Sequence, residues 1–210
     1  MPGWMEVFGF LTGAGCVALL VRQSIWTWPL GIANNLVFIV LFYRTGLYAD
    51  VGLQGFYIAI SIYGWWSWLH GGRDHGALAV SRVKAPAAVL LVLSVVAITA
   101  ALTWLLRHHT NSTVPVLDSL ITALSLVAQV MMTRKWIENW PVWIAANCLS
   151  VGLLVYKGLY LTSALYLVYQ VLCAMGWLEW HRDLGQSSDR DMTGQEAIGQ
   201  SAEGRPQLTR

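Results

Sequence analysis

Long apolar stretches recur along most of the chain and are separated by short polar segments. A helix that crosses the hydrocarbon layer of a membrane needs about 20 mostly apolar residues. Seven stretches have about this length, at 5–21, 25–43, 47–69, 85–106, 115–133, 139–156 and 158–180. The stretch 85–106 carries no charge, whereas the others contain isolated polar residues. The pattern predicts an all-α membrane protein with seven transmembrane helices.

The last part of the chain breaks this pattern. Residues 185–210 are polar and show no hydrophobic periodicity, which is typical of segments that cannot bury enough apolar surface to fold. We therefore expect one seven-helix domain over residues 1–184, followed by a disordered cytoplasmic tail over residues 185–210.

Composition excludes several classes of protein. Charged residues make up 11% of the chain, whereas soluble domains carry about 25%, so a soluble enzyme is excluded. The net charge of +2 provides no basic surface for nucleic acid. The three cysteines lie far apart in apolar stretches and the five histidines lie in loops. Since neither pattern is that of a metal site, we expect no metal and no cofactor.

Positive charge is distributed unevenly between the two sides of such a bundle. The side that holds the N-terminus has three basic residues, Arg44, Arg107 and Lys157. The other side has seven before the tail: Arg22, Arg73, Arg82, Lys84, Arg134, Lys135 and Arg182. Because Lys and Arg accumulate in cytoplasmic loops, we expect an outward N-terminus and a cytoplasmic C-terminus.

The chain also contains an internal repeat. Shifting it by 112 positions aligns 22–69 with 134–181 without a gap, and 16 of the 48 pairs are identical. The identical pairs include Trp28/Trp140, Pro29/Pro141, Asn35/Asn147 and Gly64/Gly176. We expect two three-helix repeats, 5–70 and 115–181, joined by the linker helix 85–106. The extra crossing makes the repeats parallel, an arrangement known from transporters; duplication for stability alone is the alternative.

Polar and aromatic side chains recur at helical spacing within the apolar stretches. Asp118, Thr122, Ser125 and Gln129 share one face, and so do Trp140, Trp143 and Asn147. In the repeat, the positions equivalent to the second group are Trp28, Gly31 and Asn35. Polar groups inside a bilayer usually face a partner or a polar cavity, although polar residues between helices can also serve packing alone. A cavity of amides, phenols and indoles suits a flat, neutral or weakly cationic molecule. Because no Lys or Arg lies at mid-depth, phosphorylated substrates are disfavoured.

Several segments of the sequence resemble the PnuC family of vitamin-precursor transporters. They are SIWTWPLGIANNLVFIVLF (24–42), YADVGLQGFYIAISIYGWWSWL (48–69), SLVAQVMMTRKWIENWPVWIAAN (125–147) and YKGLYLTSALYLVYQ (156–170). The resemblance covers about residues 5–183. It implies facilitated uptake of nicotinamide riboside, trapping of the substrate by intracellular phosphorylation, a homotrimer, and the three-one-three arrangement of SWEET carriers.

The resemblance also implies a set of substrate-binding residues. They are Gln54, Tyr57, Gln129, Trp140, Trp143, Asn147, Tyr169 and Gln170. In this interpretation Trp140 and Trp143 wall the aromatic ring, whereas Gln54, Gln129 and Asn147 bind the ribose and carboxamide. Pro29 and Pro141, at matching helix starts, are the expected hinges of alternating access.

Other functions stay open at this stage. Relatives of similar pattern carry thiamine or riboflavin. A proton-coupled carrier would need a titrating group, for which Asp118 is the candidate. A membrane sensor or scaffold would move no substrate. An intramembrane enzyme is disfavoured because the sequence contains no HExxH, GxSxG or Walker glycine motif.

Overall fold

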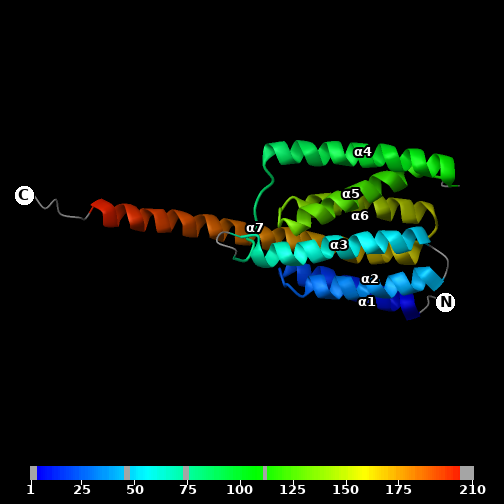
Figure 1. Ribbon diagram of the computed structural model, residues 1–210, viewed down its shortest axis with the longest axis horizontal. Helices are drawn as coiled ribbons and strands as arrows, with labels where there is room; N and C mark the ends of the chain where they lie inside the picture. The colour runs from blue at the N-terminus through cyan, green and yellow to red at the C-terminus, as the bar shows by residue number, and fades with distance from the viewer. Residues whose placement is uncertain (1–3, 45–47, 73–75, 111–112, 204–210) are drawn as a thin grey trace, which may run out of the picture.

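The chain folds into a bundle of helices. The computed structural model describes residues 4–44, 48–72, 76–110 and 113–203. These residues form α1 (Trp4–Val21), α2 (Thr27–Arg44), α3 (Tyr48–His70), α4 (Ala85–His109), α5 (Pro115–Thr133), α6 (Asn139–Tyr156) and α7 (Tyr160–Glu203), as shown in Figure 1. No β-strand occurs within the described ranges. The predicted all-α class with seven helices is confirmed.

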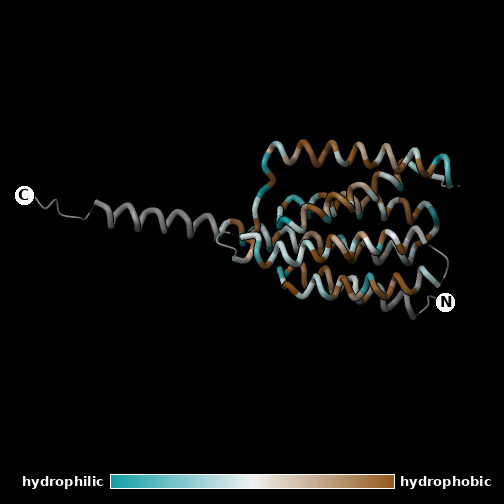
Figure 2. Tube along the Cα trace, in the orientation of Figure 1, coloured by the Kyte–Doolittle hydropathy of each residue, from teal (hydrophilic) through white to brown (hydrophobic). Residues whose placement is uncertain are grey.

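Hydropathy and length together identify membrane-crossing helices in the described residues. Three helices, α4, α5 and α6, are long and apolar enough to cross a membrane. Shorter apolar segments lie in α1 (Leu11–Val21) and α2 (Thr27–Val40). Figure 2 shows hydrophobic residues spread along the helices of the bundle. These features agree with a membrane protein.

Six of the helices are packed side by side in a closed ring. The order around the ring is α1, α2, α3, α5, α6, α7 and back to α1. Each contact among α1, α2 and α3 therefore has a counterpart among α5, α6 and α7. The two junctions between these groups, α3 with α5 and α7 with α1, also correspond under the 112-residue shift.

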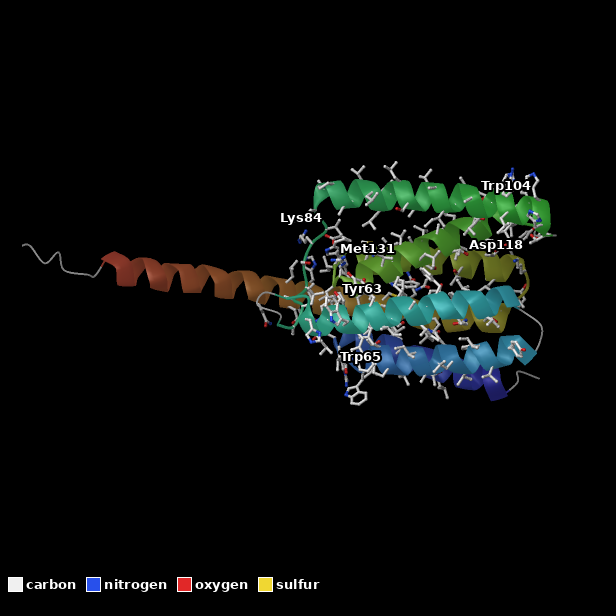
Figure 3. All side chains as sticks on the ribbon, viewed as in Figure 1. Tyr63, Trp65, Lys84, Trp104, Asp118 and Met131 are labelled. Carbon is white, nitrogen blue, oxygen red and sulfur yellow. The ribbon has the colours of Figure 1, made fainter. Side chains whose placement is uncertain are left out.

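Helix α4 lies outside this ring and packs against α5. None of its residues is buried, and apolar side chains such as Leu90 and Val92 are exposed. In Figure 3, Lys84 and Trp104 mark the opposite ends of α4. A helix with no buried residue and no charge in its central part is suited to contact with lipid on most of its surface.

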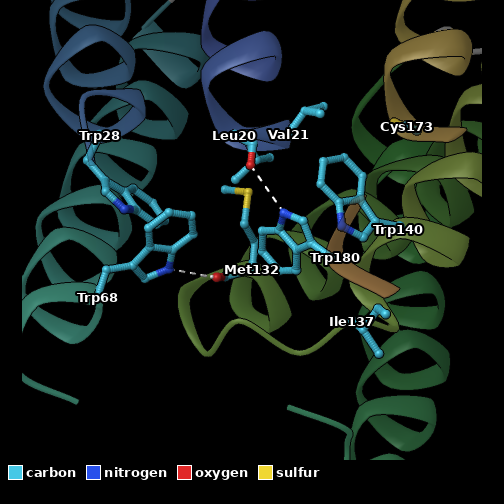
Figure 4. Close-up of a cluster of buried hydrophobic side chains, with 9 residues drawn as sticks. All are labelled: Leu20, Val21, Trp28, Trp68, Met132, Ile137, Trp140, Cys173 and Trp180. Carbon is cyan, nitrogen blue, oxygen red and sulfur yellow. Dashed lines mark hydrogen bonds between the residues drawn. The ribbon is translucent and has the colours of Figure 1, made fainter. Parts of the chain in front are cut away.

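Four tryptophans close one end of the ring. This tryptophan cluster consists of Trp28, Trp68, Trp140 and Trp180, which belong to the buried hydrophobic core in Figure 4. The Trp68 indole N–H donates to the carbonyl of Met132 (3.1 Å), and that of Trp180 donates to the carbonyl of Leu20 (3.3 Å). Because these two bonds are related by the 112-residue shift, each half of the ring is hydrogen-bonded to the other in the same way.

The tryptophan cluster depends on two glycines. The rings of Trp28 and Trp140 lie directly against Gly64 of α3 and Gly176 of α7, so that a Cβ at either glycine would overlap the indole. Each indole then meets its partner edge-on, Trp68 at 5.3 Å and Trp180 at 5.4 Å between ring centroids. Edge-to-face contact is a favoured aromatic geometry. Identical sequence positions in the two halves thus make identical packing.

Helix boundaries follow local sequence rules. Pro29 and Pro141 are each the third residue of their helix, where a missing N–H removes no intrahelical bond. Gly158 adopts a positive φ of 73° just after α6, the left-handed conformation that commonly ends a helix. The prediction that both prolines lie just inside a helix start is confirmed. Their role as hinges stays a prediction.

Helix α7 continues past the apolar stretch 158–180. Its backbone is helical to Glu203 and extends beyond the bundle in Figure 1. A helix that is already formed elongates without a new nucleation step. Polarity and missing periodicity therefore did not prevent helix formation here. Residues 204–210 lie outside the described part of the chain.

Candidate functional site

A cavity of about 390 Å³ lies inside the ring. All six ring helices line it, and α4 contributes no residue. A volume in this range is typical of pockets for small molecules, about 300–1,000 Å³. Leu20, Trp28, Met132 and Trp140 belong both to its lining and to the buried core. The tryptophan cluster therefore forms one end of the cavity.

The two halves of the ring contribute equivalent positions to the cavity. Eight pairs of lining residues lie 112 positions apart: Gly13/Ser125, Val17/Gln129, Leu20/Met132, Trp28/Trp140, Gly31/Trp143, Asn35/Asn147, Tyr57/Tyr169 and Ser61/Cys173. Three of these pairs are identical. In the pairs Val17/Gln129 and Gly31/Trp143, only the second half carries a side chain that can hydrogen-bond.

Six of the eight predicted substrate-binding residues line this cavity. They are Tyr57, Gln129, Trp140, Trp143, Asn147 and Tyr169. Gln54 does not line it, and the residue 112 positions later, Tyr166, does. Gln170 also lies outside the lining; its side-chain amide donates to the thiol of Cys148 at 3.3 Å, between α7 and α6. The structure thus brings six of the predicted residues together.

The asparagines of the cavity are partly engaged with neighbouring helices. Asn147 Nδ2 donates to the sulfur of Cys173 at 3.5 Å. Asn34 Oδ1 accepts a hydrogen bond from Thr12 of α1 at 3.0 Å, which fixes the orientation of its amide. Carboxamides both donate and accept, so these side chains can bind hydroxyl and amide groups of a ligand.

Hydroxyl groups of the lining bond to their own helices. Ser125 donates to the carbonyl of Ile121 (2.9 Å), and Ser150 donates to that of Ala146 (2.8 Å). A hydroxyl that donates in this way keeps lone pairs for further hydrogen bonds. Both serines can therefore accept from a ligand.

Aromatic groups of the lining fall into two kinds. Trp28 and Trp140 are 2% and 0% exposed and are held by Gly64 and Gly176. Trp143, Tyr57 and Tyr169 are only partly buried and can present ring faces to a ligand. Tyr169 approaches α1 so closely that its hydroxyl would overlap a Cβ at Gly13. The sequence assigned Trp140 and Trp143 the same role, but their surroundings differ.

No charged residue lines the cavity among those described. The ion pair between Lys157 and Asp118 (3.8 Å) joins the end of α6 to the first turn of α5. Asp118 lies near the end of α4 marked by Trp104 in Figure 3, and Met131 lies near the opposite end marked by Lys84. Within the described residues, no group of His, Cys, Asp and Glu could hold a metal ion.

A polar layer lies next to the tryptophan cluster, outside the cavity. The ammonium group of Lys135 lies 4.4 Å from the ring centroid of Trp68 and donates to Oε1 of Gln23 at 3.2 Å. Gln23 in turn donates to Asp183. Lys135 is 7% exposed, and burial lowers the pKa of its amine from 10.5 to about 8, against an opposing effect of Asp183.

Some lining residues carry little signal of their own in the sequence. Gly31, Asn34 and Asn35 line the cavity. The sequence indicated Gly31 and Asn35 only because the repeat pairs them with Trp143 and Asn147. Cys16 also lines the cavity, although an isolated cysteine in an apolar stretch gave no reason to expect this.

Comparisons with known proteins identify relatives of this chain. The profile of a family described as nicotinamide mononucleotide transporter matches residues 3–182. The nicotinamide riboside transporter PnuC of Escherichia coli is 27% identical, with 87% of this chain and 88% of that protein aligned. The riboflavin/roseoflavin transporter RibM of Streptomyces davaonensis is 26% identical, with 84% of each chain aligned. A crystal structure of the vitamin B3 transporter PnuC matches the fold with a TM-score of 0.66 and 23% identity, over 87% of this chain and 83% of the other.

Proposed function

The chain belongs to the nicotinamide mononucleotide transporter family, and on this basis we propose that it is a facilitative membrane transporter of nicotinamide riboside. The resemblance to the PnuC family noted in the sequence is thereby confirmed. The observation that carries the choice of substrate is the uncharged lining of the cavity.

The uncharged lining favours the riboside over its phosphorylated form. A phosphate group removed from water needs cationic or charge-assisted partners, because an unpaired buried charge is strongly unfavourable. The described lining offers amides, hydroxyls and aromatic rings but no Lys or Arg. The ring of nicotinamide riboside carries a positive charge, which aromatic faces attract.

Each group of lining residues then has a proposed role. Trp143, Tyr57 and Tyr169 provide aromatic faces, while Gln129 and Asn147 hydrogen-bond the ribose and carboxamide. Trp140 supports the end of the cavity through its contact with Trp180. Gln54 and Gln170 lie outside the cavity lining and have no proposed substrate contact in this state of the protein.

Transport would proceed by alternating access of two parallel three-helix repeats. The halves α1–α3 and α5–α7 meet at two equivalent junctions, where a relative rotation can open either end of the cavity. Pro29 and Pro141 are the proposed hinges. Among the described residues no carboxylate lines the cavity, and Asp118 is paired with Lys157, which favours facilitated diffusion over proton coupling.

The cellular setting completes the proposal. All seven helices would cross the bacterial inner membrane with the N-terminus outside and the C-terminus in the cytoplasm. Intracellular phosphorylation would trap the imported riboside for NAD synthesis. The protein would assemble as a homotrimer, with one cavity in each protomer.

Uptake of radiolabelled nicotinamide riboside into liposomes that contain the purified protein tests the function. We expect saturable uptake that collapse of the proton gradient leaves unchanged, and little competition by nicotinamide mononucleotide. The variant Asn147→Ala should lose uptake, whereas Ser94→Ala on the exposed α4 should retain it. Equal uptake of the mononucleotide, or none of the riboside, would refute the proposal.

Riboflavin is the second candidate substrate, because the relative RibM is named as a riboflavin and roseoflavin transporter. The same liposomes can be tested with riboflavin as competitor. Stronger competition by riboflavin than by unlabelled riboside would reverse the assignment.

A further inference from the structure

Gly31 and Trp143 form the most unequal of the paired cavity positions. Both line the cavity, 112 positions apart on α2 and α6. One half of the ring therefore places an indole where the other half places no side chain. Gly31 thus leaves open space beside α2, at the position where α6 carries an indole.

The fold itself does not require glycine at this position. A Cβ at Gly31 would meet no atom within 4 Å, whereas a Cβ at Gly13, Gly64 or Gly176 would overlap a neighbouring side chain. Gly31 also lies inside a regular helix, where glycine is less stable than alanine. Close packing explains why the other three positions are glycine. At Gly31 no neighbouring atom requires glycine, and the position faces the open cavity.

The volume beside Gly31 is bordered by groups suited to a carboxamide-bearing ring. On the same helix, Trp28 lies three residues earlier, and Asn34 and Asn35 lie three and four residues later; all three line the cavity. Residues at these spacings share a helix face. Because Asn34 accepts from Thr12 through its oxygen, its amide N–H groups are left to donate to a carbonyl.

We propose that the open volume at Gly31 is the subsite for the substrate's six-membered aromatic ring, which takes the place that the indole of Trp143 occupies in the other half. The ribose then extends toward Gln129 and Asn147, and the carboxamide, which the proposed function assigned to these two residues, is bound by Asn34 instead. This inference rests on the proposed function and adds to it the residue that limits the size of the ring.

Substitution at Gly31 separates a ligand role from a structural one. Gly31→Ala introduces a methyl group into the subsite and should weaken binding of nicotinamide riboside about tenfold; Gly31→Leu should weaken it at least about 100-fold. Helix propensity predicts that Gly31→Ala leaves the Tm of the purified protein unchanged or raises it by about 2 °C. Loss of binding together with retained stability identifies the subsite.

Gly152→Ala is the matched control. Gly152 lies within α6, outside the cavity lining, and a Cβ there also meets nothing within 4 Å. This variant should gain the same helix propensity and bind the riboside as the wild type does.

Nicotinamide, which lacks the ribose, distinguishes the two parts of the substrate. In competition experiments Gly31→Ala should weaken nicotinamide and the riboside by the same factor. Unchanged riboside binding in Gly31→Ala, or weakening of the riboside without nicotinamide, would overturn the subsite. If the wild type binds no riboside, the proposed function is wrong and the subsite is rejected with it.

Discussion

Lys135 and Gln23 lie 112 positions apart and are hydrogen-bonded to each other, from Nζ to Oε1 at 3.2 Å. Both adopt a positive φ, 49° and 52°, in the turns that follow α5 and α1. The turns that join the first two helices of each half therefore have the same unusual backbone and meet directly. Their contact lies against the tryptophan cluster, since the ammonium group of Lys135 also lies over the ring of Trp68, and it joins the two halves at that end of the bundle.

The buried Lys135 makes stability depend on pH. Because its pKa is lowered in the folded state to about 8 from an ordinary value of 10.5, the unfolded chain binds more protons between these values, and stability rises with pH across that window. The full effect is about 3 kcal/mol. The Tm of the detergent-solubilised protein should increase between pH 7.5 and 10, and Lys135→Met should remove this increase. The same rise in both proteins would contradict the assignment to Lys135.

The glycines under the tryptophans should be sensitive to small additions. Gly176→Ala and Gly64→Ala each force a methyl group into an indole and should destabilise the fold by about 1–3 kcal/mol. Thermal unfolding measures this loss. Gly152→Ala serves again as control and should not lower the Tm; equal behaviour of all three variants would show that the indoles can move aside.

The polar difference between the halves should govern affinity. Gln129→Val makes this position identical to Val17 and removes hydrogen-bonding groups from the cavity. We expect a roughly tenfold loss of riboside affinity, equivalent to about 1.4 kcal/mol, measured by titration calorimetry. Val17→Ile, which keeps an apolar side chain at the equivalent position, is the companion variant and should bind within about threefold of wild type.

Loss of the reciprocal indole bonds should open the cavity at the tryptophan cluster. Trp68→Phe and Trp180→Phe each remove an N–H donor and leave the Met132 or Leu20 carbonyl without it. Cys173, which lines the cavity and is buried, reports the opening in a Cys148→Ser, Cys16→Ser background. Labelling by a membrane-impermeant thiol reagent added at that end should become faster in the Trp→Phe variants. Unchanged labelling would mean that the two bonds do not control access.

The extension of α7 should be dispensable for the bundle. The partly buried Leu184 packs against the core and Asp183 accepts from Gln23, and these are the last contacts with the bundle among the side chains that the structure describes. A stop after residue 186 should leave the Tm within about 2 °C of the full chain, whereas a stop after residue 178 removes Trp180 and should prevent folding. A large loss of stability in the longer truncation would assign the extension a structural role.

Sequence patterns predicted much of this architecture because apolar length and helix phase are local properties. The shift of 112 residues identified Trp28/Trp140, and the structure gives both the same contacts. The sequence did not distinguish Trp140 from Trp143, because the distinction depends on Gly176, a residue of another helix. Gln170 illustrates a second limit: it is one residue from Tyr169, and a rotation of about 100° along the helix directs it to Cys148 instead of the cavity.

The helical backbone of α7 up to Glu203 was not predicted from the sequence. Low hydrophobicity argues against a packed core but does not argue against a helix that continues from a folded one. The length of α7 therefore depends on the folded helix from which it continues. Composition alone does not contain that information.

A duplicated cavity with eight matched pairs could in principle accept an elongated molecule in either of two opposite directions. The unlike pairs, Val17/Gln129 and Gly31/Trp143, remove this ambiguity, since the amide of Gln129 and the indole of Trp143 have no equivalent in the other half. A ligand in the cavity is thus expected to adopt one of the two orientations and not the opposite one.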